Sequence, residues 1–159
     1  MSTDVKDVRS LLVRAAREEA RRDGSRTIEA EHVLLALAAT EDTEAVRMLT
    51  EAGLTETAIR AALDREWEQS LAVAGIAVKI GLLPAATPDH QRDPQIGEST
   101  KLLLKRAMDA GSGRLGPTRI LVGILDTERG RVARALEAVG VDRAALRTKA
   151  AEALAAGAR

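Results

Sequence analysis

Residues 111–116 (Gly-Ser-Gly-Arg-Leu-Gly) have the residue types of a nucleotide-binding loop. The glycines match the spacing of the dinucleotide fingerprint, and with Pro117 and Thr118 the string nearly matches a phosphate-binding loop. Both loops follow a β-strand, and the second needs a lysine where Pro117 stands. The preceding segment, residues 102–110, has helical spacing instead. We therefore interpret the string as a tight turn between two helices and expect no binding or hydrolysis of ATP.

Residue types for metal binding, redox chemistry or nucleophilic catalysis are scarce. Cysteine is absent, which excludes disulfides, zinc-thiolate sites and a thiol nucleophile. The two histidines, His32 and His90, lie in different kinds of segment, so neither a histidine metal site nor a Ser-His-Asp triad is predicted. Acidic pairs such as Glu18-Glu19 and Glu41-Asp42 are interpreted as solvated faces and turns, and His32 is expected to hydrogen-bond nearby backbone. We predict no catalytic residue, no metal and no cofactor.

The composition limits the partners and the location of the protein. The 159 residues are 45% hydrophobic and 30% charged, enough for one domain or two small modules that bury about 70% of the unfolded surface. The chain has 24 basic and 24 acidic residues and a single aromatic residue, Trp67. It therefore lacks the net positive charge and the aromatic stacking surfaces that favour binding to nucleic acid, and the net positive charge that favours binding to an anionic membrane. The longest uncharged stretch, residues 69–78, is too short to span a membrane, and the N-terminus lacks the apolar run of a signal peptide. We expect a soluble, cytoplasmic protein.

An internal duplication organises the chain. Two stretches follow the same plan at a constant offset of 87 residues. The matched positions are Gly24 with Gly111, residues 34–37 with 121–124, Leu49 with Leu136, residues 53–54 with 140–141, and residues 58–60 with 145–147. Because one offset holds across these segments without a gap, we predict two units of the same architecture.

Apolar spacing predicts two short helices in the middle of each unit. They cover residues 30–39 and 43–52 in the first unit and residues 117–125 and 131–139 in the second. The earlier helix of each pair is apolar over most of its surface, so we expect it at the buried centre of its unit. The later helix stops at Gly53 or Gly140, where a left-handed cap is expected. In the second unit, Asp93 and Pro94 are expected to open the first helix.

These patterns predict an all-α fold of two tandem four-helix units, eight helices in all, related by a pseudo-twofold axis. Residues 1–70 form the first unit, 71–92 an irregular linker whose apolar half (73–83) packs along the units, and 93–159 the second unit. Residues 1–92 hold 12 basic and 16 acidic side chains and residues 93–159 hold 12 and 8, a polarity that can help the units dock. The predicted core contains Leu34, Leu35, Leu37, Leu49, Ile59, Leu63, Leu121, Val122, Ile124, Leu136 and Leu146.

Residues 16–20 (Ala-Arg-Glu-Glu-Ala), Gly24 and residues 31–37 (Glu-His-Val-Leu-Leu-Ala-Leu) together resemble the Clp N-terminal repeat. This repeat occurs twice in the substrate-receiving domain of ClpA- and ClpC-type AAA+ unfoldases, and residues 120–123 and 136–141 give the second unit a similar pattern. The resemblance implies an all-helical pseudo-dimeric domain that binds adaptors or tagged substrates and performs no chemistry of its own. ATPase modules follow this domain in the unfoldases, so this chain is expected to be a stand-alone relative or an excised fragment.

The resemblance also implies candidate binding residues. In ClpC-type domains of some bacteria, a glutamate at the position of Glu31 and a threonine that opens the first helix bind phosphoarginine marks on substrates. The aligned threonine position holds Lys6, and Thr3 is the substitute if the helix begins one turn earlier. In the second unit the aligned positions hold Asp93 and Thr118.

The exchange of Glu31 for Thr118 predicts opposite preferences at the two equivalent positions. The acid of the first unit favours a guanidinium or ammonium group. The second unit offers a helix N-terminus, the Thr118 hydroxyl, Arg114 and Arg119, which together attract anions such as phosphate, sulfate or carboxylate. The alternative is that both arginines face solvent.

The leading hypothesis for function is a non-enzymatic protein- or peptide-binding module that acts as an adaptor, decoy or substrate receptor in Clp-dependent proteolysis. Its expected partners are Clp unfoldase or protease components, adaptors or substrates, with peptides or small anions as further ligands, and neither nucleic acid nor membrane. One alternative is a stand-alone scavenger of small peptides or peptide antibiotics that uses the groove between the repeats. The antibiotic surface of the family, however, uses aromatic residues where this chain has Val5 and Arg92. A small helical enzyme is the other alternative.

Overall fold

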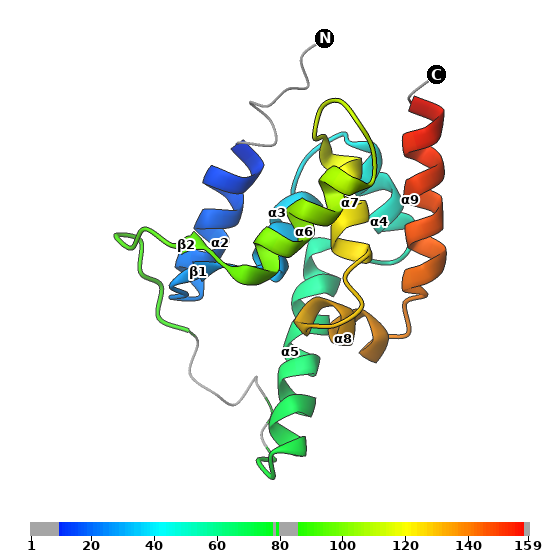
Figure 1. Ribbon diagram of the computed structural model, residues 1–159. Coiled ribbons are helices and arrows are strands. Elements are labelled where there is room, and N and C mark those ends of the chain that lie inside the picture. Colours follow the sequence, from blue (N-terminus) through cyan, green and yellow to red (C-terminus); the bar gives the residue numbers. More distant parts are fainter. Residues whose placement is uncertain (1–9, 78, 80–85, 158–159) are drawn as a thin grey trace.

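Helices dominate the structure, a computed structural model that describes residues 10–77, 79 and 86–157 (Figure 1). Its elements in chain order are η1 (Leu11–Ala16), α2 (Arg17–Arg22), β1 (Thr27–Ile28), α3 (Ala30–Ala38), α4 (Glu44–Glu51), α5 (Glu56–Val73), β2 (Gln95–Ile96), α6 (Glu98–Asp109), α7 (Pro117–Leu125), α8 (Arg131–Ala138) and α9 (Arg143–Gly157). The π-helical η1 runs directly into α2, so the two form one continuous first helix. The described residues therefore have the predicted all-α fold, with four helices in each unit.

Equivalent helices of the two units begin at a constant interval. The matched starts are Ala30 and Pro117 for α3 and α7, Glu44 and Arg131 for α4 and α8, and Glu56 and Arg143 for α5 and α9. Each pair of starts is 87 residues apart, which is the offset of the sequence repeat. The duplication read from the sequence is thus confirmed as a repeat of helices.

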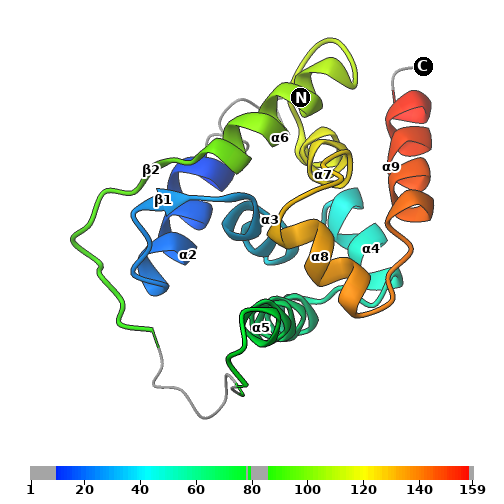
Figure 2. The ribbon, with the colours of Figure 1, turned by 60° about the horizontal axis from the view of Figure 1, so that its bottom comes forward.

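The two units pack against each other reciprocally (Figure 2). Helix α3 contacts α7 at the centre of the molecule, α5 packs on α8, and α9 packs on α4. In addition, α3 contacts α8 and α7 contacts α4. A twofold axis generates contacts of this reciprocal kind, so the packing agrees with the predicted pseudo-twofold relation.

The core follows from the apolar spacing of the helices. All eleven residues predicted to lie in it are buried, and α3 and α7 lie at its centre. Helix α7 approaches α6 so closely that a Cβ on Gly123 would lie 2.3 Å from the carbonyl oxygen of Leu103, so glycine is required there. Gly53 and Gly140 have φ values of 78° and 74°, which confirms the predicted left-handed caps.

Two apolar residues of the segment that was expected to pack along the units are exposed. Helix α5 continues to Val73, whose side chain is 92% exposed, and Ile76 is 48% exposed. These two apolar residues do not pack on the units, because α5 projects past the helices that cover its first turns (Figure 1). Residues 78 and 80–83 of the same stretch lie outside the described residues.

The start of α6 also differs from the prediction. Asp93 and Pro94 do not open this helix, which begins at Glu98 after an N-cap at Gly97. The reason is that the intervening residues, Gln95 and Ile96, pair in parallel with residues 27–28 of the first unit. This short pairing fixes the N-terminal ends of α3 and α6 next to each other.

Candidate binding site

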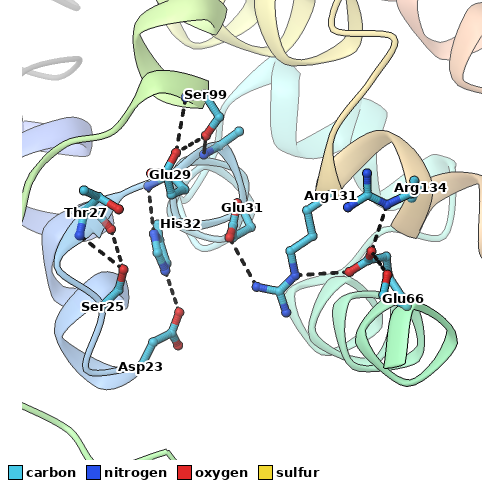
Figure 3. Close-up of polar contacts among 12 residues, drawn as sticks. Asp23, Ser25, Thr27, Glu29, Glu31, His32, Glu66, Ser99, Arg131 and Arg134 are labelled. Carbon is cyan, nitrogen blue, oxygen red and sulfur yellow. Dashed lines mark hydrogen bonds and ion pairs between the residues drawn. The ribbon is translucent and has the colours of Figure 1, made fainter. Parts of the chain in front are cut away.

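A chain of charged side chains crosses from one unit to the other (Figure 3). Glu31, in the first turn of α3, accepts a hydrogen bond at 3.2 Å from Nη1 of Arg131, the first residue of α8. The Glu31 side chain is only 13% exposed. The acid that was expected to receive a guanidinium group therefore already holds one, and it comes from the second unit of the same chain.

Glu66 on α5 is the second acid of this chain of charges. Its side chain is 3% exposed and accepts hydrogen bonds from Arg134 Nε at 2.9 Å and Ser70 Oγ at 2.7 Å, while Arg131 Nε lies 3.3 Å from its other oxygen. Burial raises the pKa of the Glu66 carboxyl, but the hydrogen bonds from Ser70 and Arg134 and the charges of both arginines outweigh it and hold the pKa below its usual value. The Arg131 guanidinium also lies 5.9 Å from the centre of the Trp67 ring. We call Glu31, Glu66, Arg131 and Arg134 the inter-unit seam.

A second polar contact between the units joins the starts of α3 and α6. The Ser99 hydroxyl donates to the Glu29 carboxylate and accepts from the amide N–H of Ala30 at 2.8 Å. The Glu29 carboxylate also accepts from the amide N–H of Ser99 at 3.2 Å, so each helix start is capped by a side chain from the other unit. Burial raises the pKa of Glu29, but the hydrogen bonds from Ser99 outweigh it and lower the pKa. A Cβ at Gly97 would lie 1.9 Å from Glu29 Oε1, so a larger residue there would displace the Glu29 side chain from its hydrogen bonds with Ser99.

His32 is a buried structural residue, as the sequence suggested. Its Nδ1 accepts a hydrogen bond at 2.9 Å from the backbone N–H of Glu29, and its Nε2 lies 2.5 Å from Asp23 Oδ2. The structure does bring an aspartate to this histidine, but the other ring nitrogen is occupied by backbone and not by a serine. Among the described residues no three histidine or acidic side chains come together as metal ligands. The arrangement holds the start of α3 in place.

An open groove of about 770 Å³ lies between the first helix, the loop after α3 and the start of α7. Its apolar lining residues are Leu11, Ala15, Ala36, Ala39 and Pro117, and its charged ones are Arg14, Glu18, Glu41 and Asp42. Because Pro117 belongs to the second unit, both units build the groove. A volume of this size accommodates a short peptide or a drug-sized ligand.

Comparison with known proteins identifies the family. A model of the Clp repeat N-terminal domain matches residues 7–110, which include residues 7–70 of the first unit, the linker and α6. The chain belongs to the Clp N-terminal repeat family. No curated protein matches the chain. Clp N-terminal domains are non-catalytic and generally mediate protein interactions in Clp systems.

The Clp N-terminal fold places the predicted anion-binding residues of the second unit in different settings. Arg119 is buried, and its guanidinium donates to six backbone carbonyl oxygens of residues 107–114. All its N–H groups are thereby engaged, so Arg119 fixes the loop between α6 and α7 and has no donor left for an anion. Thr118 is half-buried in the first turn of α7, Arg114 is exposed on the loop, and a binding role for these two stays a prediction.

The remaining candidates of the Clp N-terminal resemblance are placed as follows. Thr3 and Val5 lie outside the described residues. Arg92 forms an ion pair with Asp89 at 3.1 Å and donates to the Gly24 carbonyl at 2.9 Å, so it fastens the end of the linker to the first unit. None of the helices in the described part of the chain is long and apolar enough to cross a membrane.

A groove between the repeats was expected only as the ligand site of a scavenger, and its lining residues were not named from the sequence. Leu11 is 7% exposed in the core and Ala15 packs against the core, and both side chains also line the groove. Ala16 and Ala20 are completely buried, whereas Ala15 is only partly buried and lines the groove.

Proposed function

We propose that this Clp N-terminal chain is a non-enzymatic protein- and peptide-binding module of the cytoplasm, which acts as an adaptor, decoy or substrate receptor in Clp-dependent proteolysis. The observation that carries the proposal is the open groove of about 770 Å³, apolar on its floor and charged on its rim, in a family of non-catalytic domains. An apolar surface with a polar rim is typical of protein-binding sites. Clp unfoldase or protease components and their substrates are the proposed partners.

A degradation assay tests this role. The purified chain is titrated into a reaction that contains the Clp unfoldase and peptidase of the same organism and an unfolded protein substrate. An adaptor raises the rate of degradation, and a decoy or a receptor that retains substrate lowers it. An unchanged rate at a large molar excess of the chain contradicts the proposal.

A pair of variants assigns any effect to the groove. Ala39 is exposed and lines the groove, so Ala39→Trp fills it, whereas Ala155 is exposed on α9 and lies outside the groove lining. We expect Ala39→Trp to abolish the effect on degradation and Ala155→Trp to retain it. Equal behaviour of the two variants contradicts the assignment to the groove.

The scavenger is the second candidate, because the groove volume also suits a small peptide or an antibiotic. In that case, native mass spectrometry of the chain isolated from its own cytoplasm shows a stoichiometric small ligand, and no Clp component is recovered with it. Recovery of a Clp unfoldase without a small ligand favours the adaptor, decoy or receptor role instead.

A further inference from the structure

We propose that the groove selects partner segments in which an apolar side chain stands next to a lysine or arginine. This inference rests on the proposed binding function and specifies the class of segment bound. It follows from the charges on the rim, from the apolar floor, and from a comparison with the equivalent place in the second unit.

The floor of the groove provides the apolar part of the recognition. Leu11 and Ala15 of η1 face Ala36 and Ala39 at the end of α3, and Pro117 closes the side formed by the second unit. Small side chains dominate, so the floor leaves room for a larger apolar side chain of a partner. Burying such a side chain favours binding without selecting a charge.

The rim provides the selection for charge. Among the described residues that line the groove, Glu18, Glu41 and Asp42 oppose one base, Arg14, which gives an excess of two negative charges. The Glu18 carboxylate already contacts Arg21 at 3.5 Å and His90 at 3.1 Å. In contrast, Glu41 and Asp42 are exposed and form no ion pair within the described residues. Two acids on one loop beside an apolar floor attract a cationic side chain that flanks an apolar one.

The second unit shows that this charge is specific to one groove. Thr40 and Thr127 are equivalent, because the hydroxyl of each donates to the carbonyl oxygen four residues earlier, at 3.0 Å and 3.2 Å. The loop after Thr40 continues Glu41-Asp42, whereas the loop after Thr127 continues Glu128-Arg129.

The cavity beside the second loop measures only about 240 Å³. Arg129 and Arg131 line it, and its acids Glu29 and Glu31 are already paired with Ser99 and Arg131. A cationic partner segment is therefore expected in the first groove and not in this cavity.

Three dye-labelled octapeptides of alternating residues provide the test: Leu with Lys, Leu with Gln, and Leu with Glu. Binding is measured by fluorescence anisotropy at low and at physiological salt. We expect the Leu-Lys peptide to bind about 3- to 10-fold more tightly than the Leu-Gln peptide, with the difference shrinking as salt rises, and the Leu-Glu peptide to bind least.

A charge-matched pair of variants assigns the preference to the rim. Glu41→Gln with Asp42→Asn removes two charges from the groove, and asparagine tolerates the left-handed φ of 52° at position 42. Glu128→Gln with Glu152→Gln removes two exposed acids that do not line the groove. We expect the first double variant to lose the preference for lysine and the second to keep it.

The outcomes separate this inference from the proposed function. If peptides bind and Ala39→Trp abolishes binding, but the Leu-Lys preference is absent or survives Glu41→Gln with Asp42→Asn, the charge selection is refuted and peptide binding stands. If none of the three peptides binds at millimolar concentration, the peptide-binding function itself is contradicted. A preference that the control double variant also removes is a net-charge effect and likewise refutes the role of the rim.

Discussion

Replacing Glu66 by glutamine tests whether the inter-unit seam stabilises the fold. Glutamine keeps the shape of the side chain and one acceptor oxygen, but it removes the negative charge that faces Arg134 at 2.9 Å and Arg131 at 3.3 Å. Glu66 belongs to the first unit and both arginines belong to the second. The substitution therefore weakens a contact between units and leaves the helix that carries it intact.

The expected magnitude follows from the exposure of the three side chains. A hydrogen bond to a charged group contributes about 1.5–3 kcal/mol, and breaking a fully buried ion pair costs about 3–5 kcal/mol. Here Glu66 is 3% exposed, but Arg131 and Arg134 are 33% and 58% exposed, so the arginines recover hydration when the charge is lost. Arg131 also keeps Glu31. We therefore expect a loss of about 1–2 kcal/mol in the free energy of unfolding.

Urea denaturation measures this loss with two probes. Fluorescence of Trp67, the only tryptophan, follows the seam, and far-ultraviolet circular dichroism follows the helices. With a slope of about 2 kcal/mol per molar urea, the midpoint falls by about 0.5–1 M. Glu152→Gln is the matched control, because Glu152 is exposed on α9 and forms no ion pair within the described residues. Its midpoint is expected to stay within about 0.2 M of the parent value, as for an ordinary surface substitution.

The pH dependence gives an independent check on the same carboxyl group. Its pKa in the folded protein lies below the usual value of 4.5, so its ionised form stabilises the fold above that pH, and this stabilisation is lost as pH falls through the folded pKa. Between neutral pH and acid, the difference in stability between the parent and Glu66→Gln should therefore shrink. Equal midpoints for Glu66→Gln and Glu152→Gln at neutral pH, or a difference that grows in acid, would refute the reasoning.

The remaining predictions concern the core, the contact at α6 and the glycine loop. Leu35→Ala should lower the free energy of unfolding by about 2–5 kcal/mol in a urea titration, because Leu35 is 5% exposed in the core. Gly97→Ala should lower it by about 1–3 kcal/mol in the same assay, since the new Cβ displaces Glu29 from its hydrogen bonds with Ser99. Calorimetry should detect no ATP binding at millimolar nucleotide, because residues 111–116 connect two helices, α6 and α7.

Each of these predictions has a control or an outcome that contradicts it. Leu102 is 39% exposed, so Leu102→Ala should cost clearly less than Leu35→Ala, and equal losses would contradict the burial of Leu35. At Gly111 the nearest atom to a new Cβ is 3.8 Å away, so Gly111→Ala should cost less than Gly97→Ala. Micromolar ATP binding that Gly113→Val abolishes would contradict the interpretation of the glycine loop.

The helical repeat could be predicted because its signals are local. The spacing of apolar residues, the glycine stops and the constant offset all lie within a few residues of the elements that they specify. Residues such as Leu34 and Leu121 therefore identified the buried helices, and both side chains are almost completely buried. The reciprocal packing of the units follows from the duplication, since equivalent apolar helix faces pack against equivalent helices of the other unit.

The polar contacts between units could not be predicted, because each depends on residues that tertiary packing brings together. Arg131 and Glu31 are 100 positions apart, and nothing in their neighbourhoods marks them as partners. The two-residue strand at Gln95 and Ile96 is too short to leave a periodic signal, so the helix start was placed at Asp93 instead. Arg119 follows a proline at the start of a helix, where an arginine usually faces solvent, but the preceding loop curls around its guanidinium.

The duplication creates two equivalent contacts between the units, and these contacts differ in charge and in the size of the cavity beside them. The repeat offset of 87 residues makes Thr118 the equivalent of Glu31 and Glu44 the equivalent of Arg131. Because threonine is uncharged, it cannot form an ion pair with Glu44. In the inter-unit seam, the Arg131 side chain of the second unit binds Glu31 of the first unit and lines a cavity of about 240 Å³. No such pair can form beside Pro117, where the groove measures about 770 Å³. Divergence at two equivalent positions thus leaves the Glu31–Arg131 ion pair in one copy of the inter-unit contact and removes its counterpart from the other copy.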